Sequence, residues 1–242
     1  MKEFLSKVWR FIWKTVLWFF GLSILTVIIY RWIPVPVTPL MIIRCVEQKI
    51  DGKALRLKKD WEPLENISRN LQLAVVCSED QHFIDHSGFD FEAIDKAIKY
   101  NEHHKRKRGA STISQQTAKN VFLWSGRSWV RKGFEVYFTF LIECLWSKER
   151  IMEVYLNVIE MGDGVYGAQA TSNYFFHKDA SNLSKGEAAL IAAVLPNPRR
   201  FSVARPTGYI LKRQGWIIHQ MALWGGPIQF EEPEEKDSRK KK

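Results

Sequence analysis

The feature that most restricts this chain is an uncharged apolar segment close to its N-terminus. Residues 15–30 contain no Asp, Glu, Lys or Arg, and the mostly apolar stretch around them runs from Phe11 to Ile33. About 20 apolar residues in a helix cross the hydrocarbon core of a bilayer. Trp and Tyr crowd both ends of the stretch, as they do at membrane interfaces. The segment therefore predicts a transmembrane helix over residues 11–33.

A cleaved signal peptide is the competing interpretation of this segment. Its apolar region would be shorter and would end in a small-x-small cleavage site, whereas Tyr30-Arg31-Trp32-Ile33-Pro34 follows here. We favour an uncleaved anchor. Only Arg31 follows the span closely, while the basic residues before it are Lys2, Lys7, Arg10 and Lys14. By the positive-inside rule, residues 1–10 would be cytoplasmic and the body would lie on the other side.

The remainder of the chain predicts one helical domain. Residues 34–60 read as a stiff Pro-rich linker followed by short strands at Met41–Val46 and Ala54–Leu57. Residues 61–226 form the folded body. Residues 227–242 read as a disordered tail, because residues 231–242 have nearly no apolar side chains. Within the body, helical periodicity predicts helices at 91–103 (capped by Asp90), 134–146 (deeply buried), 148–159, 188–195 and 206–224.

Charge and cysteine usage narrow the functional classes. The formal net charge of +10 suits nucleic acid, anionic headgroups or phosphorylated substrates, and an anchored body outside the cytosol argues against nucleic acid. The run Lys105–Arg108 is either a solvated face or a contact with anionic headgroups. Cys45, Cys77 and Cys144 show no CxxC spacing. Cys77 and Cys144 lie in apolar helical runs and are predicted to be buried thiols.

Glu79 is the first candidate catalytic residue. The apolar run Leu71–Cys77 leads into it, so Glu79 is expected at or near the end of a buried helix. The negative end of the helix, the neighbouring Asp80 and the loss of water would each raise the pKa of its carboxyl group. A carboxyl held closer to neutrality suits a general acid or base. The plain alternative is a solvated glutamate in the last turn of a helix.

A second candidate region lies between residues 109 and 135. Thr112 and Gln115 have capping-box spacing. The helix that follows would carry Gln116, Lys119 and Asn120 on its exposed side and Val121 and Leu123 on its inner side. It is either an ordinary capped helix or a polar wall whose N-terminus faces an anion.

Cations gather in the same region. Lys119, Arg127, Arg131 and Lys132 fall between positions 119 and 132, and Glu135 follows at helical spacing from the last two. Surface ion pairs of this kind contribute only ~0.3–0.5 kcal/mol to folding. A cation cluster with one carboxylate beside it is also what a diphosphate site needs.

Five stretches resemble, in order, the signature motifs of the peptidoglycan glycosyltransferases (glycosyltransferase family 51). They are Glu79-Asp80-x-x-Phe83-x-x-His86-x-Gly88; Gly109-Ala110-Ser111-Thr112-Ile113-Ser114-Gln115-Gln116 with Lys119-Asn120; Arg131-Lys132-x-x-Glu135; Lys148-x-x-Ile151-x-Glu153-x-Tyr155-Leu156-Asn157; and Leu183-Ser184 to Pro198. Ala110, Ser114 and Thr171-Ser172 depart from the usual residues, conservatively in size. The anchor with a lone domain resembles the family's monofunctional members, and no K-T-G of a transpeptidase is present.

The resemblance implies a mainly α, lysozyme-like fold with a small membrane-associated lobe. The aromatic and basic residues between Phe83 and Trp129 are candidates for that lobe. It implies a single-pass protein of the bacterial inner membrane with a periplasmic catalytic domain. The expected partners are lipid II, the nascent glycan chain and membrane lipids, and other cell wall synthesis or division proteins are left open. Lipid II would be polymerised with inversion to a β-1,4 bond, and undecaprenyl diphosphate would leave.

Residue roles follow from the same resemblance. Glu79 would be the general base, and Glu135, the second glutamate of the family, would orient the cations or hold a divalent ion. Lys119, Arg127 and Lys132 would hold the diphosphate. The remaining substrate-binding residues expected are Ser111, Gln116, Asn120 and Arg131. No cofactor is expected to be required, and a Mg²⁺ or Mn²⁺ ion at the diphosphate is left open.

Three rival interpretations use the same residues. A lytic, lysozyme-like enzyme also uses a glutamate near an apolar helix end, but it needs neither diphosphate-binding cations nor a lipid-facing surface. A zinc site at His82 and His86 rests on i,i+4 spacing alone, and Ser87-Gly88 suggests that the helix has already ended. A non-catalytic membrane scaffold would not need both glutamates together with the cations.

Overall fold

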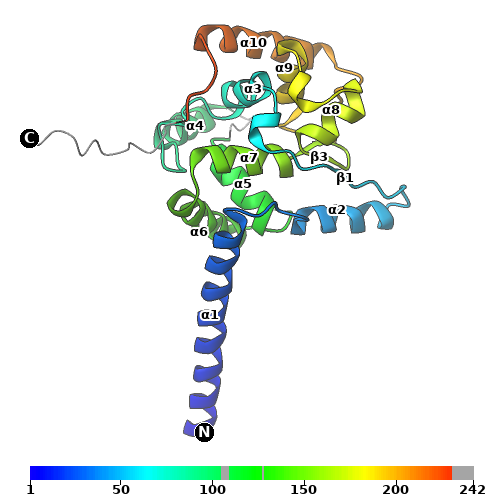
Figure 1. Ribbon diagram of the computed structural model, residues 1–242. Coiled ribbons are helices and arrows are strands. Elements are labelled where there is room, and N and C mark those ends of the chain that lie inside the picture. Colours follow the sequence, from blue (N-terminus) through cyan, green and yellow to red (C-terminus); the bar gives the residue numbers. More distant parts are fainter. Residues whose placement is uncertain (105–108, 127, 231–242) are drawn as a thin grey trace, which may run out of the picture.

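The computed structural model describes residues 1–104, 109–126 and 128–230, so Arg127, the run Lys105–Arg108 and the tail from 231 onward lie outside the described residues. The predicted mainly α fold is confirmed (Figure 1). The helices are α1 (Lys2–Tyr30), α2 (Pro39–Ile50), α3 (Arg69–Glu79), α4 (Phe91–His103), α5 (Ile113–Phe122), α6 (Trp129–Leu145), α7 (Lys148–Val158), α8 (Ala168–Phe176), α9 (Lys185–Val194) and α10 (Gly208–Trp224).

Short elements complete the described part of the chain. The 3₁₀ turn η1 (Leu64–Asn66) precedes α3, and the 3₁₀ turn η2 (Ala180–Asn182) precedes α9. The strands β1 (Lys58–Lys59), β2 (Glu160–Gly162) and β3 (Val165–Tyr166) form a small sheet in the order β1-β3-β2. β1 runs parallel to β3, and β2 runs antiparallel to it. The sheet therefore ties the segment after α2 to the turn between α7 and α8.

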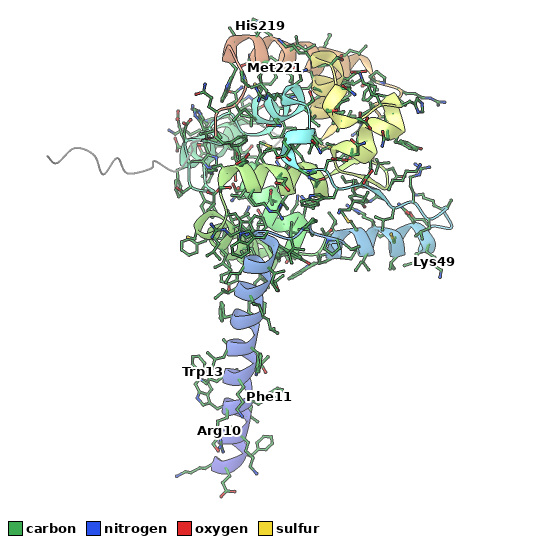
Figure 2. All side chains as sticks on the ribbon, viewed as in Figure 1. Arg10, Phe11, Trp13, Lys49, His219 and Met221 are labelled. Carbon is green, nitrogen blue, oxygen red and sulfur yellow. The ribbon has the colours of Figure 1, made fainter. Side chains whose placement is uncertain are left out.

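Helix α1 stands out from the body as a single long rod (Figure 1). Its side chains are mostly exposed, and Phe11 and Trp13 project from it away from every other element (Figure 2). It is 29 residues long, so at 1.5 Å per residue it measures about 43 Å. Among the described residues, it is the one helix that is long and apolar enough to cross a membrane. The helix includes most of the predicted span and extends it toward the N-terminus.

The last turns of α1 are fastened to the body. Trp146 Nε1 donates to the carbonyl oxygen of Val27 at 2.8 Å. The Arg150 guanidinium donates to the carbonyl oxygens of Tyr30 at 2.8 Å and Ile33 at 2.7 Å. The Pro-rich linker beyond them is also held, because Val35 is fully buried. The span and the domain are therefore joined by fixed contacts.

The strand predicted at Met41–Val46 is wrong, because these residues belong to α2. Thr38 caps this helix by accepting from the amide of Met41 at 3.3 Å, and Pro39 occupies its first position. A side-chain cap followed by Pro is a strong helix start, and it outweighs the β-branched residues that follow. No strand forms at 54–57 either, because the residues that pair with β3 are Lys58–Lys59.

The core lies where α3 packs against α9 and α10, and where α5 packs against α6 and α7. The other predicted helices are present with ends shifted by a few residues, and Asp90 caps α4 as predicted. The prediction of deep burial for residues 134–146 is wrong, because Val136 and Phe140 on α6 are exposed. Cys77 is buried as predicted, whereas Cys144 on the outer face of α6 is exposed.

Candidate active site

Glu79 is the last residue of α3, at the helix end predicted for it. Its Oε2 accepts a hydrogen bond from the Gln116 side-chain amide of α5 at 2.9 Å. The other end of that amide, Gln116 Oε1, accepts from the hydroxyl of Tyr155 on α7 at 3.3 Å. Because Tyr155 is fully buried, this chain of contacts fixes the direction in which the Glu79 carboxyl group points.

The surroundings of Glu79 raise its pKa, as predicted. Burial is the largest cause, and the nearby Asp80 charge adds to it. The Gln116 hydrogen bond, the Arg213 charge and the Ser78 hydroxyl act in the opposite direction without cancelling the effect of burial. A carboxyl group in this state accepts a proton more readily than an ordinary glutamate does.

The general-base role predicted for Glu79 implies a pH dependence of the rate. That role requires the deprotonated carboxylate, so the raised pKa of Glu79 should place the acid limb of kcat/KM above the ordinary glutamate pKa of 4.5. Because the Gln116 hydrogen bond lowers that pKa, Gln116→Leu should move the limb to still higher pH. The measurement is kcat/KM against pH for both proteins. A limb that stays in place in the variant would contradict the role given to Gln116.

Asp80, the neighbour of Glu79, has a different task. Its carboxylate contacts His86 Nε2 at 2.9 and 3.1 Å and accepts from the backbone amide of Ile113 at 2.9 Å. His86 Nδ1 accepts from the amide of Gly88, which leaves Nε2 as the protonated nitrogen that donates to Asp80. Asp80 therefore binds the N-terminus of α5 to the segment that follows α3, and sets the position of Gln116 relative to Glu79.

Asp80→Asn should destabilise the folded protein. The amide keeps one acceptor oxygen and turns an NH₂ group toward donors, so either His86 or the Ile113 amide loses its buried partner. We expect a loss of about 1–3 kcal/mol, or about 2–4 °C in Tm for each kcal/mol, in detergent-solubilised protein. Asp95→Asn, on the exposed face of α4, is the control. Equal melting of the two variants would contradict this role.

Lys119 extends from α5 into the same region. Burial lowers the pKa of its ammonium group, and Glu135, Arg131, Lys132 and Glu79 all act on it electrostatically. Within the described ranges, no hydrogen bond or ion pair joins this ammonium to another residue. A partly buried amine without a partner, between two glutamates, is arranged to receive an anion.

Arg131, Lys132 and Glu135 form one cluster on α6. Glu135 is buried, and its two oxygens meet Arg131 Nη1 at 2.6 Å and Lys132 Nζ at 2.5 Å. Arg131 is buried too and also donates to the carbonyl oxygen of Gly126 at 2.8 Å. Lys132 is the exposed member, with ammonium hydrogens left for another acceptor. Glu135 thus orients two cations, one of which faces solvent.

The other predicted binding residues differ in their exposure to solvent. Ser111 is exposed just ahead of Thr112, which caps α5 in the predicted capping box. The expectation that Asn120 is exposed is wrong, because it is buried and its Nδ2 donates to the carbonyl oxygen of Gln116. Gln116 is engaged at both ends of its amide. Arg127 lies outside the described residues. The roles of these residues in substrate binding remain predictions.

Two residues that contribute to the site were not identified from the sequence. Arg213, on α10, donates to the carbonyl oxygen of Ser78 at 3.0 Å and acts on the Glu79 charge. It lies 135 residues from Ser78 in the chain, and no local pattern marks it. Glu143 on α6 is the second, because it accepts from Ser114 of α5 and from Lys148 at 2.9 Å. Helical spacing on α6 would have placed Glu143 about three turns after Lys132 and about two turns after Glu135, on the same side.

Metal sites built by the protein find little support. Among the described residues, no group of three or more His, Cys, Asp or Glu side chains is placed to hold an ion. His86 is bound to Asp80, and His82 contacts the exposed Asp85 at 3.4 Å. Both oxygens of Glu135 already meet cations. A divalent ion that arrives with a diphosphate stays a prediction.

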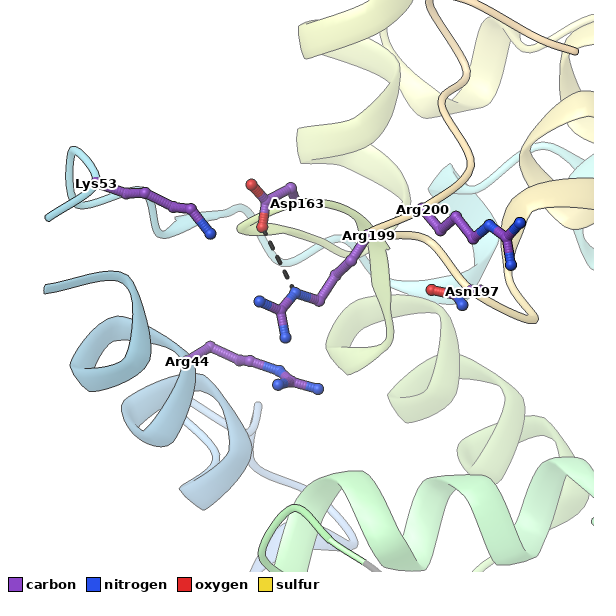
Figure 3. Close-up of a pocket in the computed structure, with 6 residues that line it drawn as sticks. All are labelled: Arg44, Lys53, Asp163, Asn197, Arg199 and Arg200. Atoms are coloured by element: carbon purple, nitrogen blue, oxygen red, sulfur yellow. Dashed lines mark ion pairs between the residues drawn. The ribbon is translucent and has the colours of Figure 1, made fainter. Parts of the chain in front are cut away.

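A separate polar cavity of about 370 Å³ lies between α2 and the loop after α9. Its lining is Arg44, Lys53, Asp163, Asn197, Arg199 and Arg200 (Figure 3). Its charges are largely matched, because Glu47 contacts both Arg44 and Arg199. Neither Glu79 nor Lys119 lines it. The predicted site at Glu79 and Lys119 is therefore separate from this cavity.

Comparisons with known proteins agree with the sequence motifs. Residues 47–222 match the profile of the Transglycosylase family. A biosynthetic peptidoglycan transglycosylase of Bacteroides thetaiotaomicron is 57% identical over 240 residues, which cover 98% of this chain and 97% of that protein. Namesakes from Bdellovibrio bacteriovorus and Pseudomonas putida are 57% and 54% identical; both matches cover 88% of this chain, and they cover 85% and 91% of those proteins.

Proposed function

Because this chain belongs to the transglycosylase family and is a peptidoglycan glycosyltransferase, we propose that its substrate is lipid II, a disaccharide-pentapeptide on undecaprenyl diphosphate. The growing glycan chain is the donor, and a second lipid II molecule is the acceptor. The observation that carries this proposal is the pairing, in one site, of a half-buried Glu79 held by Gln116 with a Lys119 ammonium that has no hydrogen-bond or ion-pair partner among the described residues.

Glu79 acts as the general base. Its carboxylate takes the proton from the acceptor's sugar 4-hydroxyl as that oxygen attacks the anomeric carbon of the donor. The new C–O bond forms on the face opposite the diphosphate, so an α-linked diphosphate becomes a β-1,4 glycosidic bond. Gln116, held by Tyr155, keeps the carboxylate aimed at the hydroxyl. General-base assistance of this kind contributes ~10²–10⁴-fold to the rate.

The leaving group is the lipid diphosphate, which gains negative charge as the anomeric bond breaks. Lys119 and the exposed side of Lys132 stabilise that charge. Fixed cations in a partly dry site supply a large share of catalysis, because they need no reorganisation when the charge develops. Glu135 holds Lys132 and Arg131 in place, so its effect on the reaction passes through these two cations.

A bilayer-bound substrate fits the surface around the site. We place α1 across the bacterial inner membrane, with the domain in the periplasm. Large apolar side chains are exposed on two helices of the body, namely Phe91 and Ile98 on α4 and Trp129, Val130 and Phe140 on α6. Exposed apolar patches mark contacts with membranes or partners. They support a membrane-associated lobe that meets the lipid headgroups.

The test is the direction of the reaction. Purified full-length protein in detergent, with no other enzyme present, should convert lipid II into glycan strands visible by gel electrophoresis. The same protein incubated with isolated sacculi should release no muropeptides. Release of muropeptides without polymerisation would favour a lytic enzyme instead. Inactivity in both assays would favour a scaffold.

A further inference from the structure

An apolar groove of about 280 Å³ runs between the membrane-spanning helix and α6. Its lining is Phe19 and Phe20 of α1 and Val130, Gly133, Phe134 and Tyr137 of α6. The Phe19 and Phe134 rings lie 5.4 Å apart, as do those of Phe20 and Tyr137. Tyr137 also hydrogen-bonds to Ser23 of α1 at 2.8 Å. The walls are therefore fixed with respect to each other.

Gly133 is the one described residue lining the groove that has no side chain. A Cβ atom built at this residue would meet no other atom within 4 Å. The space beside its Cα therefore belongs to the groove rather than to the packed core. Glycine in a helix interior lowers stability by about 0.5–1 kcal/mol relative to alanine, and packing does not require it here. Keeping the groove beside α6 open is a physical reason for a glycine at this position.

The groove and the diphosphate-binding cations occupy neighbouring faces of the same turns of α6. Arg131 and Glu135 face the core and are buried, whereas Val130, Phe134 and Tyr137 face α1. Lys132 and Gly133 are adjacent in sequence, which places them about 100° apart around the helix. A ligand held at Lys132 thus needs to pass only around the first turn of α6, a helix about 10 Å wide, to reach the groove.

We propose that this groove binds the proximal part of the substrate's polyprenyl chain while the diphosphate is held at Lys119 and Lys132. The proposal rests on the function proposed above. One wall of the groove is the membrane-spanning helix α1, so the groove opens to the bilayer and is expected to bind a molecule dissolved in it. A polyprenyl diphosphate joins such a chain to the anion that the α6 cations attract. A phospholipid acyl chain or a second spanning helix would fill the same space without using those cations.

The test fills the groove with a larger side chain and varies the length of the polyprenyl chain of the substrate. Gly133→Leu should place its side chain in the groove and lower kcat/KM for undecaprenyl lipid II by at least about tenfold, equivalent to about 1.4 kcal/mol. For an analogue with a chain of only a few isoprene units, the loss should be much smaller. The matched control is Gly215→Leu on α10, where a Cβ is equally unobstructed. It should behave as the unmodified protein does on both substrates.

A second measurement needs no turnover. A polyprenyl diphosphate with a diazirine near its diphosphate should label α1 or α6 in the unmodified protein, and Gly133→Leu should reduce that labelling. Loss of label on addition of excess phosphatidylglycerol would assign the groove to bilayer lipid and overturn the proposal. A change in oligomeric state in Gly133→Leu would assign it to another helix, with the same consequence.

The remaining outcomes separate the two proposals. If Gly133→Leu has no effect, or the same effect on long and short chains with the melting temperature unchanged, the groove does not bind the chain. If the unmodified protein polymerises neither substrate, the proposed function itself fails. In that case, labelling by the polyprenyl diphosphate still decides whether the groove holds a chain.

Discussion

Replacing Glu79 with glutamine is expected to lower lipid II polymerisation by about 10²- to 10⁴-fold, the usual contribution of a general base. Glutamine has the same shape, and its oxygen can still accept from Gln116. The loss therefore comes from proton transfer rather than from a displaced side chain. Binding of lipid II should change by less than about threefold, which is below 1 kcal/mol.

The stability of this variant separates chemistry from folding. Burial raises the folded pKa of Glu79, so the stability associated with this group is present at low pH and is lost as pH rises through the folded pKa. At neutral pH, a neutral glutamine removes this penalty, and Glu79→Gln should melt at the same temperature or higher. Glu149→Gln, on the exposed side of α7, is the control. Polymerisation within a few-fold of normal in Glu79→Gln would remove Glu79 from the mechanism.

Replacing Lys119 with methionine should reduce turnover by about 10²- to 10³-fold, as loss of one fixed charge-stabilising group does. Unlike Arg131 and Lys132, Lys119 has no ion-pair partner among the described residues, so its charge is available to the leaving diphosphate. Inhibition by added inorganic diphosphate should weaken as well. Steady-state kinetics of polymerisation with and without diphosphate measure both effects.

Stability should move in the opposite direction from activity in Lys119→Met. Burial lowers the folded pKa of the ammonium group, so the charged form is destabilising at neutral pH, and the apolar side chain relieves this. A melting temperature equal to or above normal, together with low activity, would identify a site maintained for function. Lys212→Met, at an exposed position of α10, is the control. Unchanged turnover in Lys119→Met would contradict the diphosphate site.

The sequence predicted the parts of the site that depend on neighbouring residues. The apolar run before Glu79 places it at a buried helix end, and burial is indeed the main cause of its raised pKa. Arg131, Lys132 and Glu135 pair at the helical spacing that the sequence shows. The capping box at Thr112 is formed as well. Each of these depends on contacts within a few residues along one helix.

Contacts between residues far apart in the chain could not be predicted from the sequence. Asp80 raises the pKa of Glu79 as the like-charged neighbour that the sequence predicted. The sequence did not show that its carboxylate also binds the amide of Ile113, 33 residues away. Asn120 and Lys119 are adjacent, and helical periodicity could not show that Asn120 would be buried while Lys119 would stay partly exposed. Helix α2 was misassigned because its cap at Thr38 carries more weight than the β-branched residues after it.

The attachment of α1 has a consequence for how a glycan strand grows. Trp146 and Arg150 hydrogen-bond directly to the backbone at the end of α1. The anchor and the catalytic domain are therefore joined without a flexible hinge at these contacts. If α1 lies in the bilayer as we propose, Glu79 and Lys119 stay at a fixed height above the lipid surface. A lipid-linked substrate would then reach them by lateral diffusion in the membrane. The growing glycan strand would move away from the enzyme, rather than the enzyme along the strand.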